Sequence, residues 1–148
     1  MGLDVSDFSR FEVDRFSFIR CDMDKRANIA GATADQAPFD IIIDDASHTF
    51  LEFFPKLKPC GLHIIEDSGW QPKTHERDDI TRTAALFQTY LATGSFGHSD
   101  PAVCQEFDAL RLDISGAFVF QVHYRKDLRD QVAVIHKRRG LAKRCASG

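Results

Sequence analysis

The sequence of 148 residues contains no long uninterrupted apolar run, and it has one tryptophan and two tyrosines. A helix that crosses a bilayer needs about 20 mainly apolar residues, so the sequence predicts no transmembrane helix and no membrane partner. The first residues, MGLDVSDFSRFEVDRF, are interrupted by acidic and basic side chains. They lack the apolar centre of a secretory signal peptide, so no such leader is expected at this end.

Closely spaced cysteines are also missing, because Cys21, Cys60, Cys104 and Cys145 are scattered along the chain. A structural zinc site would show paired cysteines such as CxxC, and a disulfide framework would be denser. The pattern therefore argues against both. It favours reduced thiols and a cytoplasmic location.

An excess of basic residues is absent as well. Lysine and arginine total 19 against 22 aspartates and glutamates, a net charge of −3. A basic nucleic-acid binder is disfavoured by this balance. The basic residues near the end of the chain lack interleaved aromatic residues, so a solvated tail is preferred over a phosphate-binding segment. We expect one domain over residues 1–136 and a basic tail over residues 137–148.

What the sequence does contain is the pattern of a globular α/β protein, with 43% apolar and 28% charged residues. Apolar runs that predict strands alternate with stretches at helical spacing, which favours a mainly parallel sheet. The last two strands are separated by a short charged turn, so they should form an antiparallel pair. Strands are expected near residues 2–5, at 16–20, 39–43, 62–65, 117–124 and 131–135; helices within 25–38, at 50–57 and at 80–93; and a turn at 59–61.

Acidic residues follow four successive predicted strands. Asp4 ends the first, Asp22 the second, the pair Asp44 and Asp45 the third, and Glu66 with its neighbour the fourth. If the strands are parallel, these carboxylates share one edge of the sheet. A single acid at a strand end often serves as a cap for the next helix or turn. Four such sites in succession favour a functional edge.

The later acids suggest a metal site. Asp45, Glu66 and Asp67 would offer an all-oxygen donor set, which suits Mg²⁺ or Mn²⁺. Such an ion lowers the pKa of a bound hydroxyl, and His48, three residues after Asp45, is placed to accept the proton as a general base. Taken alone, His48 is more typical of a helix cap or a solvent-facing residue; the neighbouring acids shift the balance toward a base.

The earlier acids suggest a nucleoside site instead. In nucleotide-binding α/β folds a carboxylate at a strand end accepts hydrogen bonds from ribose hydroxyls. This analogy assigns Asp4 to a ribose, and it assigns Asp22 to the neighbouring base or amino group.

Two segments carry a family resemblance: FDIIIDDASH at residues 39–48 and FFPKLKPCGLHIIEDSGWQP at residues 53–72. Together they resemble class I S-adenosylmethionine-dependent methyltransferases. The likeness is greatest to the metal-dependent sugar O-methyltransferases of macrolide biosynthesis and their relatives near the cephalosporin hydroxylases. It implies a Rossmann-like fold, S-adenosylmethionine and Mg²⁺ as cofactors, and a small-molecule hydroxyl as substrate. Relatives are often multimeric, so a homo-oligomer is also expected.

The resemblance assigns roles by position. Asp45, Glu66 and Asp67 would hold the divalent metal, and His48 would deprotonate a sugar hydroxyl.

On the cofactor side, the resemblance places Asp4 at the ribose of S-adenosylmethionine and Asp22 near its adenosine. It also assigns Asp44 to the cofactor site.

The sequence departs from the family in three respects, one of which is a shortened segment between His48 and Phe53. Members begin with a strand and a glycine-rich loop, which this chain does not show before GLDVSD. In the family's sheet that strand lies between those of GLDV and FDIII, so we expect an N-terminally truncated fold of two half-sheets and impaired cofactor binding. Cys60 stands where the family has glycine, which costs about 1 kcal/mol if that position has a positive φ.

Two other functions fit the same residues. A metal-dependent hydrolase would use the acids and the histidine on a metal-activated water, but it would not need Asp4 or Asp22. A non-catalytic remnant that self-associates would use the exposed strand edges and the 13 phenylalanines. Substituting Asp4 separates the first alternative from methyl transfer, and light scattering tests the second.

Overall fold

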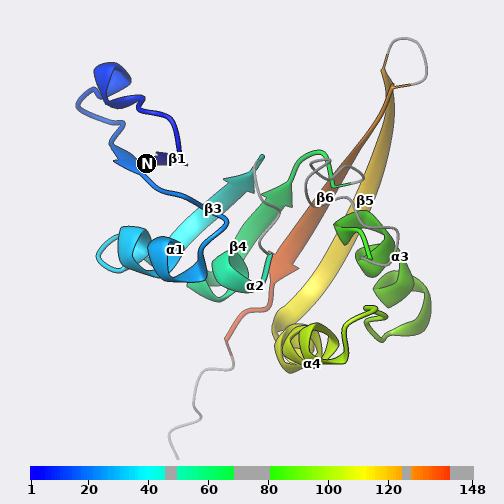
Figure 1. Cartoon of the computed structure of the whole chain (residues 1–148). Coiled ribbons are helices and arrows are strands. Elements are labelled where there is room, and N and C mark those ends of the chain that lie inside the picture. Colours follow the sequence, from blue (N-terminus) through cyan, green and yellow to red (C-terminus); the bar gives the residue numbers. More distant parts are fainter. Residues whose placement is uncertain (46–49, 69–80, 125–127, 141–148) are drawn as a thin grey trace, which may run out of the picture.

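The computed structural model describes residues 1–45, 50–68, 81–124 and 128–140 (Figure 1). The strands are β1 (Gly2–Asp4), β2 (Phe18–Arg20), β3 (Phe39–Asp44), β4 (Leu57–Ile65), β5 (Ile114–Tyr124) and β6 (Leu128–Lys137). The helices are α1 (Arg26–Thr33), α2 (Phe50–Phe53), α3 (Thr83–Thr93) and α4 (Pro101–Leu110), with single 3₁₀ turns at Ser9–Phe11, Phe54–Lys56 and Arg111–Asp113. In the described part of the chain, every helix is too short or too polar to span a membrane.

The strands form two separate sheets. β1 and β2 pair in parallel, and the larger sheet has the order β3-β4-β6-β5. Within it β3 and β4 are parallel, whereas β6 is antiparallel to both β4 and β5. The predicted α/β class, the parallel early strands and the antiparallel closing pair are therefore confirmed. The division into two half-sheets is also as predicted.

Phenylalanines form the centre of the main core. The ring of Phe50 packs against those of Phe54, Phe87 and Phe107, with centroid separations of 4.7, 5.1 and 5.4 Å. These residues come from α2, α3, α4 and the turn after α2, and they cover the same face of the larger sheet (Figure 1). The ring contacts explain why a chain with few tyrosines and tryptophans carries so many phenylalanines.

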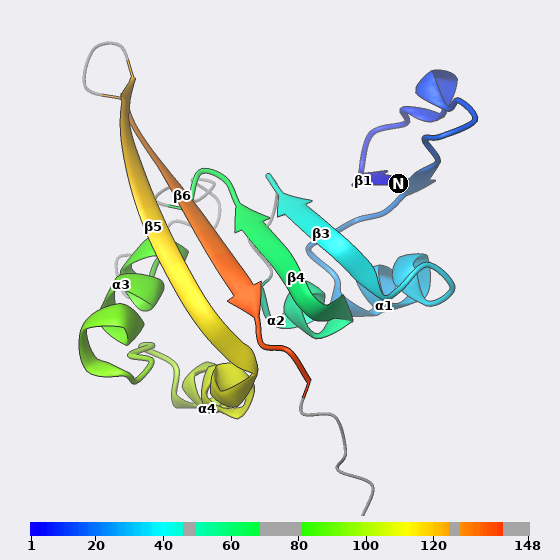
Figure 2. The ribbon, with the colours of Figure 1, turned by 180° about the vertical axis from the view of Figure 1, so that it is seen from behind.

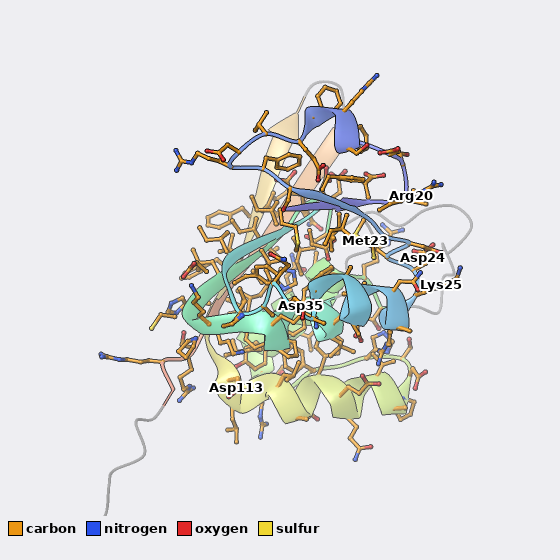
Figure 3. The ribbon with its side chains drawn as sticks, turned by 90° about the vertical axis from the view of Figure 1, so that its left-hand side faces the viewer. Arg20, Met23, Asp24, Lys25, Asp35 and Asp113 are labelled. Carbon is orange, nitrogen blue, oxygen red and sulfur yellow. The ribbon has the colours of Figure 1, made fainter. Side chains whose placement is uncertain are left out.

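A smaller core joins the β1–β2 pair to the larger sheet. Cys21, Ile29 and Phe53 are buried together, and Leu3 of β1 and Met23 pack against them. In Figure 3, Met23 lies between the β1–β2 ribbon and α1, whereas Asp24 and Lys25 lie at the outer margin. This contact fixes where the carboxyl end of β1 stands relative to that of β3.

Several local expectations differ from the structure. The helix expected at residues 50–57 is shorter, because α2 ends at Phe53 and β4 begins at Leu57. The turn expected at residues 59–61 is wrong, because these residues lie within β4. The helix α4 was not predicted, although Asp100 caps it by accepting a hydrogen bond from the Ala102 N–H at 2.8 Å. The strand β6 continues to Lys137, which is the first residue of the expected tail.

Candidate functional site

A cleft of about 320 Å³ lies between β1 and β3, and residues from the beginning and from the carboxyl end of both strands line it. Its walls include Asp4 at the end of β1, and Asp44 and Asp45 at the end of β3. The structure therefore brings together three of the acids predicted to line one edge. The position of each carboxylate is set by the end of a short strand, because β1 ends at Asp4 and β3 ends at Asp44.

Asp4 is half-buried and is held in a fixed orientation. Its Oδ1 accepts a hydrogen bond from the Ser6 N–H at 2.7 Å, so the carboxylate closes a turn directly after β1. The backbone of Asp4 is also held in place, because the Cys21 N–H donates to the Asp4 carbonyl at 2.8 Å. One carboxylate oxygen of Asp4, a residue that lines the cleft, thus accepts a hydrogen bond within its own turn.

Asp44 is buried, with 3% of its surface exposed. Its Oδ2 lies 4.0 Å from Nε2 of His63, which is fully buried on the neighbouring strand β4. Burial lowers the pKa of His63 to about 3, so the ring is neutral near pH 7 and the contact is not an ion pair. The ring instead stacks on Phe50 at 5.6 Å. His63 is therefore a packed core residue.

The predicted metal ligands lie at adjacent strand ends. Asp44 pairs with Ile65 in the parallel register, and the Glu66 N–H donates to the Asp44 carbonyl at 2.9 Å. Asp45 and Glu66 are thus the next residues of neighbouring strands, and both are exposed. Asp67 follows with a positive φ of 45° and is exposed. Within the described ranges, however, no three acidic, histidine or cysteine side chains stand close enough to hold a metal ion.

Ser68 fixes the chain directly after these acids. Its N–H and its hydroxyl both donate to the Gln131 carbonyl, at 2.8 and 2.7 Å, and its own carbonyl accepts from the Ala84 N–H at 3.0 Å. The residue is buried, with 1% of its surface exposed. The end of β4 is therefore tied both to β6 and to the start of α3.

Asp22 is paired with a nearby lysine and is not part of the described lining of the cleft. Its Oδ2 pairs with Lys25 Nζ at 2.7 Å, and this hydrogen bond holds the pKa of Asp22 below its usual value. The described lining of the cleft includes its neighbour Met23 but not Asp22, Glu66 or Asp67. The nucleoside role predicted for Asp22 remains a prediction.

His48, the predicted base, lies outside the described residues. The apolar walls of the cleft were not predicted as site residues. Met23, Thr33, Ile42 and Phe53 line it together with the acids. Apolar and small residues of this kind carry no chemical signal in a sequence, and only their proximity in the fold marks them.

No family model matches the chain. Over 103 residues it is 34% identical to the 8-demethyl-8-alpha-L-rhamnosyl tetracenomycin-C 2'-O-methyltransferase of Streptomyces olivaceus, covering 63% of this chain and 27% of that protein. Over 73 residues it is 37% identical to the demethylmacrocin O-methyltransferase of Streptomyces fradiae, covering 45% of this chain and 18% of that protein.

Solved structures show a similarity to the same group of enzymes. The MycE methyltransferase from the mycinamycin biosynthetic pathway, in complex with Mg and SAH, matches with a TM-score of 0.58 and 26% identity. The match covers 93% of this chain and 34% of that one. The chain resembles the macrolide sugar O-methyltransferases in both sequence and fold. The resemblance predicted from residues 39–72 is thereby confirmed, while the chain spans about a quarter of the first relative's length.

Proposed function

We propose that this chain belongs to the catalytic part of an S-adenosylmethionine-dependent O-methyltransferase that acts on a hydroxyl of a sugar or small natural product. The observation that carries the proposal is the cleft that brings Asp4 of β1 opposite Asp44 and Asp45 of β3. The relative from Streptomyces olivaceus is named as an O-methyltransferase of a rhamnosyl tetracenomycin. The MycE methyltransferase has been solved in complex with Mg, SAH and mycinamycin VI. These names support a small-molecule partner, and the scattered cysteines favour a cytoplasmic location.

The cofactor side of the proposal rests on Asp4 and Asp44. Asp4 keeps one carboxylate oxygen for its own turn, which leaves the other oxygen to accept hydrogen bonds from ribose hydroxyls. Asp44 is buried beside neutral His63, on the wall of the same cleft. Asp22 is engaged by Lys25 and would contribute after that exposed pair opens, at small cost.

The metal side rests on Asp45, Glu66 and Asp67. Their oxygen donors suit Mg²⁺, and the parallel register makes Asp45 and Glu66 neighbours at the strand ends. A divalent ion held there lowers the pKa of a substrate hydroxyl. His48 would accept the proton from that hydroxyl, since it follows Asp45 by three residues and histidine is the side chain best suited to proton transfer near neutral pH.

Titration calorimetry with SAH, with and without Mg²⁺, tests the cofactor site. We expect saturable binding that is weaker than micromolar, because β1 and β3 belong to separate sheets. Asp4→Asn should abolish it, whereas Asp24→Asn, on an exposed side chain at the outer margin, should leave it unchanged. Micromolar binding would refute the expected impairment. No saturable binding at any accessible concentration would refute the cofactor site itself.

Methyl transfer is measured with S-adenosylmethionine carrying a labelled methyl group and mycinamycin VI as the hydroxyl acceptor. Loss of transfer in Asp4→Asn and in Glu66→Gln is expected. The hydrolase alternative predicts a different result, since a metal-activated water would act without Asp4. Retention of ester or amide hydrolysis by Asp4→Asn would support that alternative against methyl transfer.

A further inference from the structure

The imidazole ring of His63 lies between the larger sheet and α2, and it is polar where its surroundings are apolar. None of its surface is exposed. Among the described residues, neither Nδ1 nor Nε2 has a hydrogen-bond partner. A buried polar group without a partner destabilises a fold, so such groups are rare and often have a function. His63 therefore needs an explanation beyond packing.

Two phenylalanines of α2 hold this ring in place. Phe50 stacks on it with centroids 5.6 Å apart and an interplanar angle of 11°, and Phe53 meets it edge-on at 6.2 Å. These contacts fix the plane of the ring, and with it the directions in which the two nitrogens point. A phenylalanine would make the same contacts without burying two nitrogens, so packing alone does not account for a histidine.

Asp44 lies beside the ring on the neighbouring strand. His63 pairs with Ile42 in the parallel register, so Asp44 is its diagonal neighbour on the same face of the sheet. Figure 2 shows β3 and β4 side by side, with α2 behind them. Asp44 Oδ2 is 4.0 Å from His63 Nε2, which is about 1 Å longer than a hydrogen bond. A small movement of either side chain would form the bond.

The neighbours of His63 belong to the wall of the cleft between β1 and β3. Ile42, Asp44 and Phe53 line that cleft, whereas His63 stands behind them and is not part of its described lining. The ring contacts this wall at Phe53 and at Asp44. A molecule in the cleft would therefore touch Asp44 but not the histidine, so His63 can act on it only through Asp44.

We propose that His63 is a positioning residue for the cofactor site: its Nε2–H donates a hydrogen bond to Asp44 Oδ2 when the cofactor binds. This inference rests on the proposed function, since it takes Asp44 as a cofactor-binding residue. The bond holds one carboxylate oxygen and leaves the other to accept a hydrogen bond from the cofactor. Hydrogen bonds that are long in a free site often shorten in the complex.

The protonation state of the ring suits this role. Burial lowers the pKa of His63 to about 3, so near pH 7 the ring is neutral and carries a single N–H. In the free chain this N–H is unsatisfied, and binding of the cofactor gives it a partner. The free chain thus keeps an unfavourable buried group that is relieved only in the complex, as is common at functional sites.

NMR titration with SAH compares the unmodified chain with three variants. His63→Phe keeps a ring against Phe50 but lacks the N–H, and we expect it to weaken SAH binding about 10- to 100-fold. His63→Gln retains an N–H donor and should recover much of the affinity. His98→Gln is the control, because His98 is outside the described lining and bonds locally to the Asp100 N–H; it should bind as the unmodified chain does. Equal affinity of His63→Phe and the unmodified chain would overturn the proposal.

Thermal unfolding separates positioning from packing. His63→Phe removes two buried nitrogens that lack partners among the described residues, so it should raise the Tm of the free chain while it weakens SAH binding. A role in packing alone predicts that the two quantities do not move in opposite directions. Loss of both Tm and affinity in His63→Phe would therefore overturn the proposal.

The ring proton reports the hydrogen bond directly. In ¹H–¹⁵N spectra of the histidine rings, the Nε2–H signal of His63 should shift downfield when SAH is added, because a carboxylate acceptor deshields the proton. The ring signals of His98 should stay in place. SAH binding without a change at His63 would overturn this inference and leave the proposed function standing. Absence of SAH binding by the unmodified chain would refute the proposed cofactor site, and this inference with it.

Discussion

The Glu66 N–H donates a hydrogen bond to the Asp44 carbonyl at 2.9 Å, which joins the acidic end of β4 to that of β3. This bond continues the parallel ladder one step beyond the last paired residues, Asp44 and Ile65. It holds Glu66 beside the strand that carries Asp45. The relative placement of the acids therefore depends on how closely β3 and β4 approach each other.

The backbone is tightly packed around Gly61 of β4, next to Asp40 of β3, and this provides a first prediction. A Cβ there would lie 2.9 Å from the Lys58 carbonyl oxygen and 3.0 Å from that of Asp40, both backbone atoms that cannot move alone. We expect Gly61→Ala to lower the free energy of unfolding by about 1–3 kcal/mol. Urea denaturation measures this change.

Gly31 supplies the matched control for that substitution. It lies inside α1, and a Cβ there meets nothing within 4 Å. Gly31→Ala should therefore stabilise the chain by about 0.5–1 kcal/mol through helix propensity. Equal effects of the two substitutions would contradict the close approach at Gly61.

Cys60 gives a second prediction. Its φ of 67° lies in the left-handed region, which strains the backbone of a residue with a Cβ. Its side chain is exposed, so burial of the side chain does not offset that strain. Cys60→Gly should raise the free energy of unfolding by about 1 kcal/mol. Cys60→Ala also removes the thiol but keeps a Cβ, so it should leave stability nearly unchanged. If both variants stabilised equally, the thiol and not the backbone would be responsible.

These two positions also show what the sequence could and could not predict. The cost of Cys60 followed from the family's glycine, and the structure gives that position a positive φ. The turn predicted around it was wrong, because β4 passes through Pro59 and Cys60 with an irregular register to β3. Proline and glycine signal a turn locally, but pairing with a neighbouring strand outweighed that signal.

In the candidate site, too, the sequence predicts some features and not others. Asp44, Asp45 and Glu66 were predicted together because each ends an apolar run, and parallel strands bring such ends to one edge. The orientation of Asp22 toward Lys25 was not predicted, since it depends on a local ion pair. The helix α4 was also missed, although Asp100 followed by Pro101 is a typical N-terminal signal.

Lys137 carries a third prediction. Although it begins the segment expected to be a tail, its Nζ donates to the carbonyls of Pro55 and Leu57, each at 2.9 Å. Lys137→Met should cost about 1–3 kcal/mol of unfolding free energy, because it leaves partly buried carbonyls without this donor. Lys58→Met removes a more exposed ion pair with Asp40 and should cost less than about 1 kcal/mol. Similar costs for both would show that Lys137 is a surface residue in solution.

The buried histidine carries the last prediction, on pH. Burial lowers the pKa of His63 to about 3, whereas an unfolded histidine titrates near 6.5. Between these values the unfolded chain binds the proton and the folded chain does not, so stability falls as the pH falls from 6.5 toward 3. The loss from this group should reach roughly 2 kcal/mol at pH 5, and above pH 6.5 it should vanish.

The measurement is urea denaturation at a series of pH values for the unmodified chain and two variants. His63→Leu should lose the part of the pH dependence between pH 6.5 and 4, because the proton-binding group is gone from both states. His98→Gln should keep it, since His98 is partly exposed and hydrogen-bonds the Asp100 N–H at 2.9 Å. An unchanged pH profile in His63→Leu would mean that His63 is protonated in the fold, where Asp44 Oδ2 lies 4.0 Å from its Nε2.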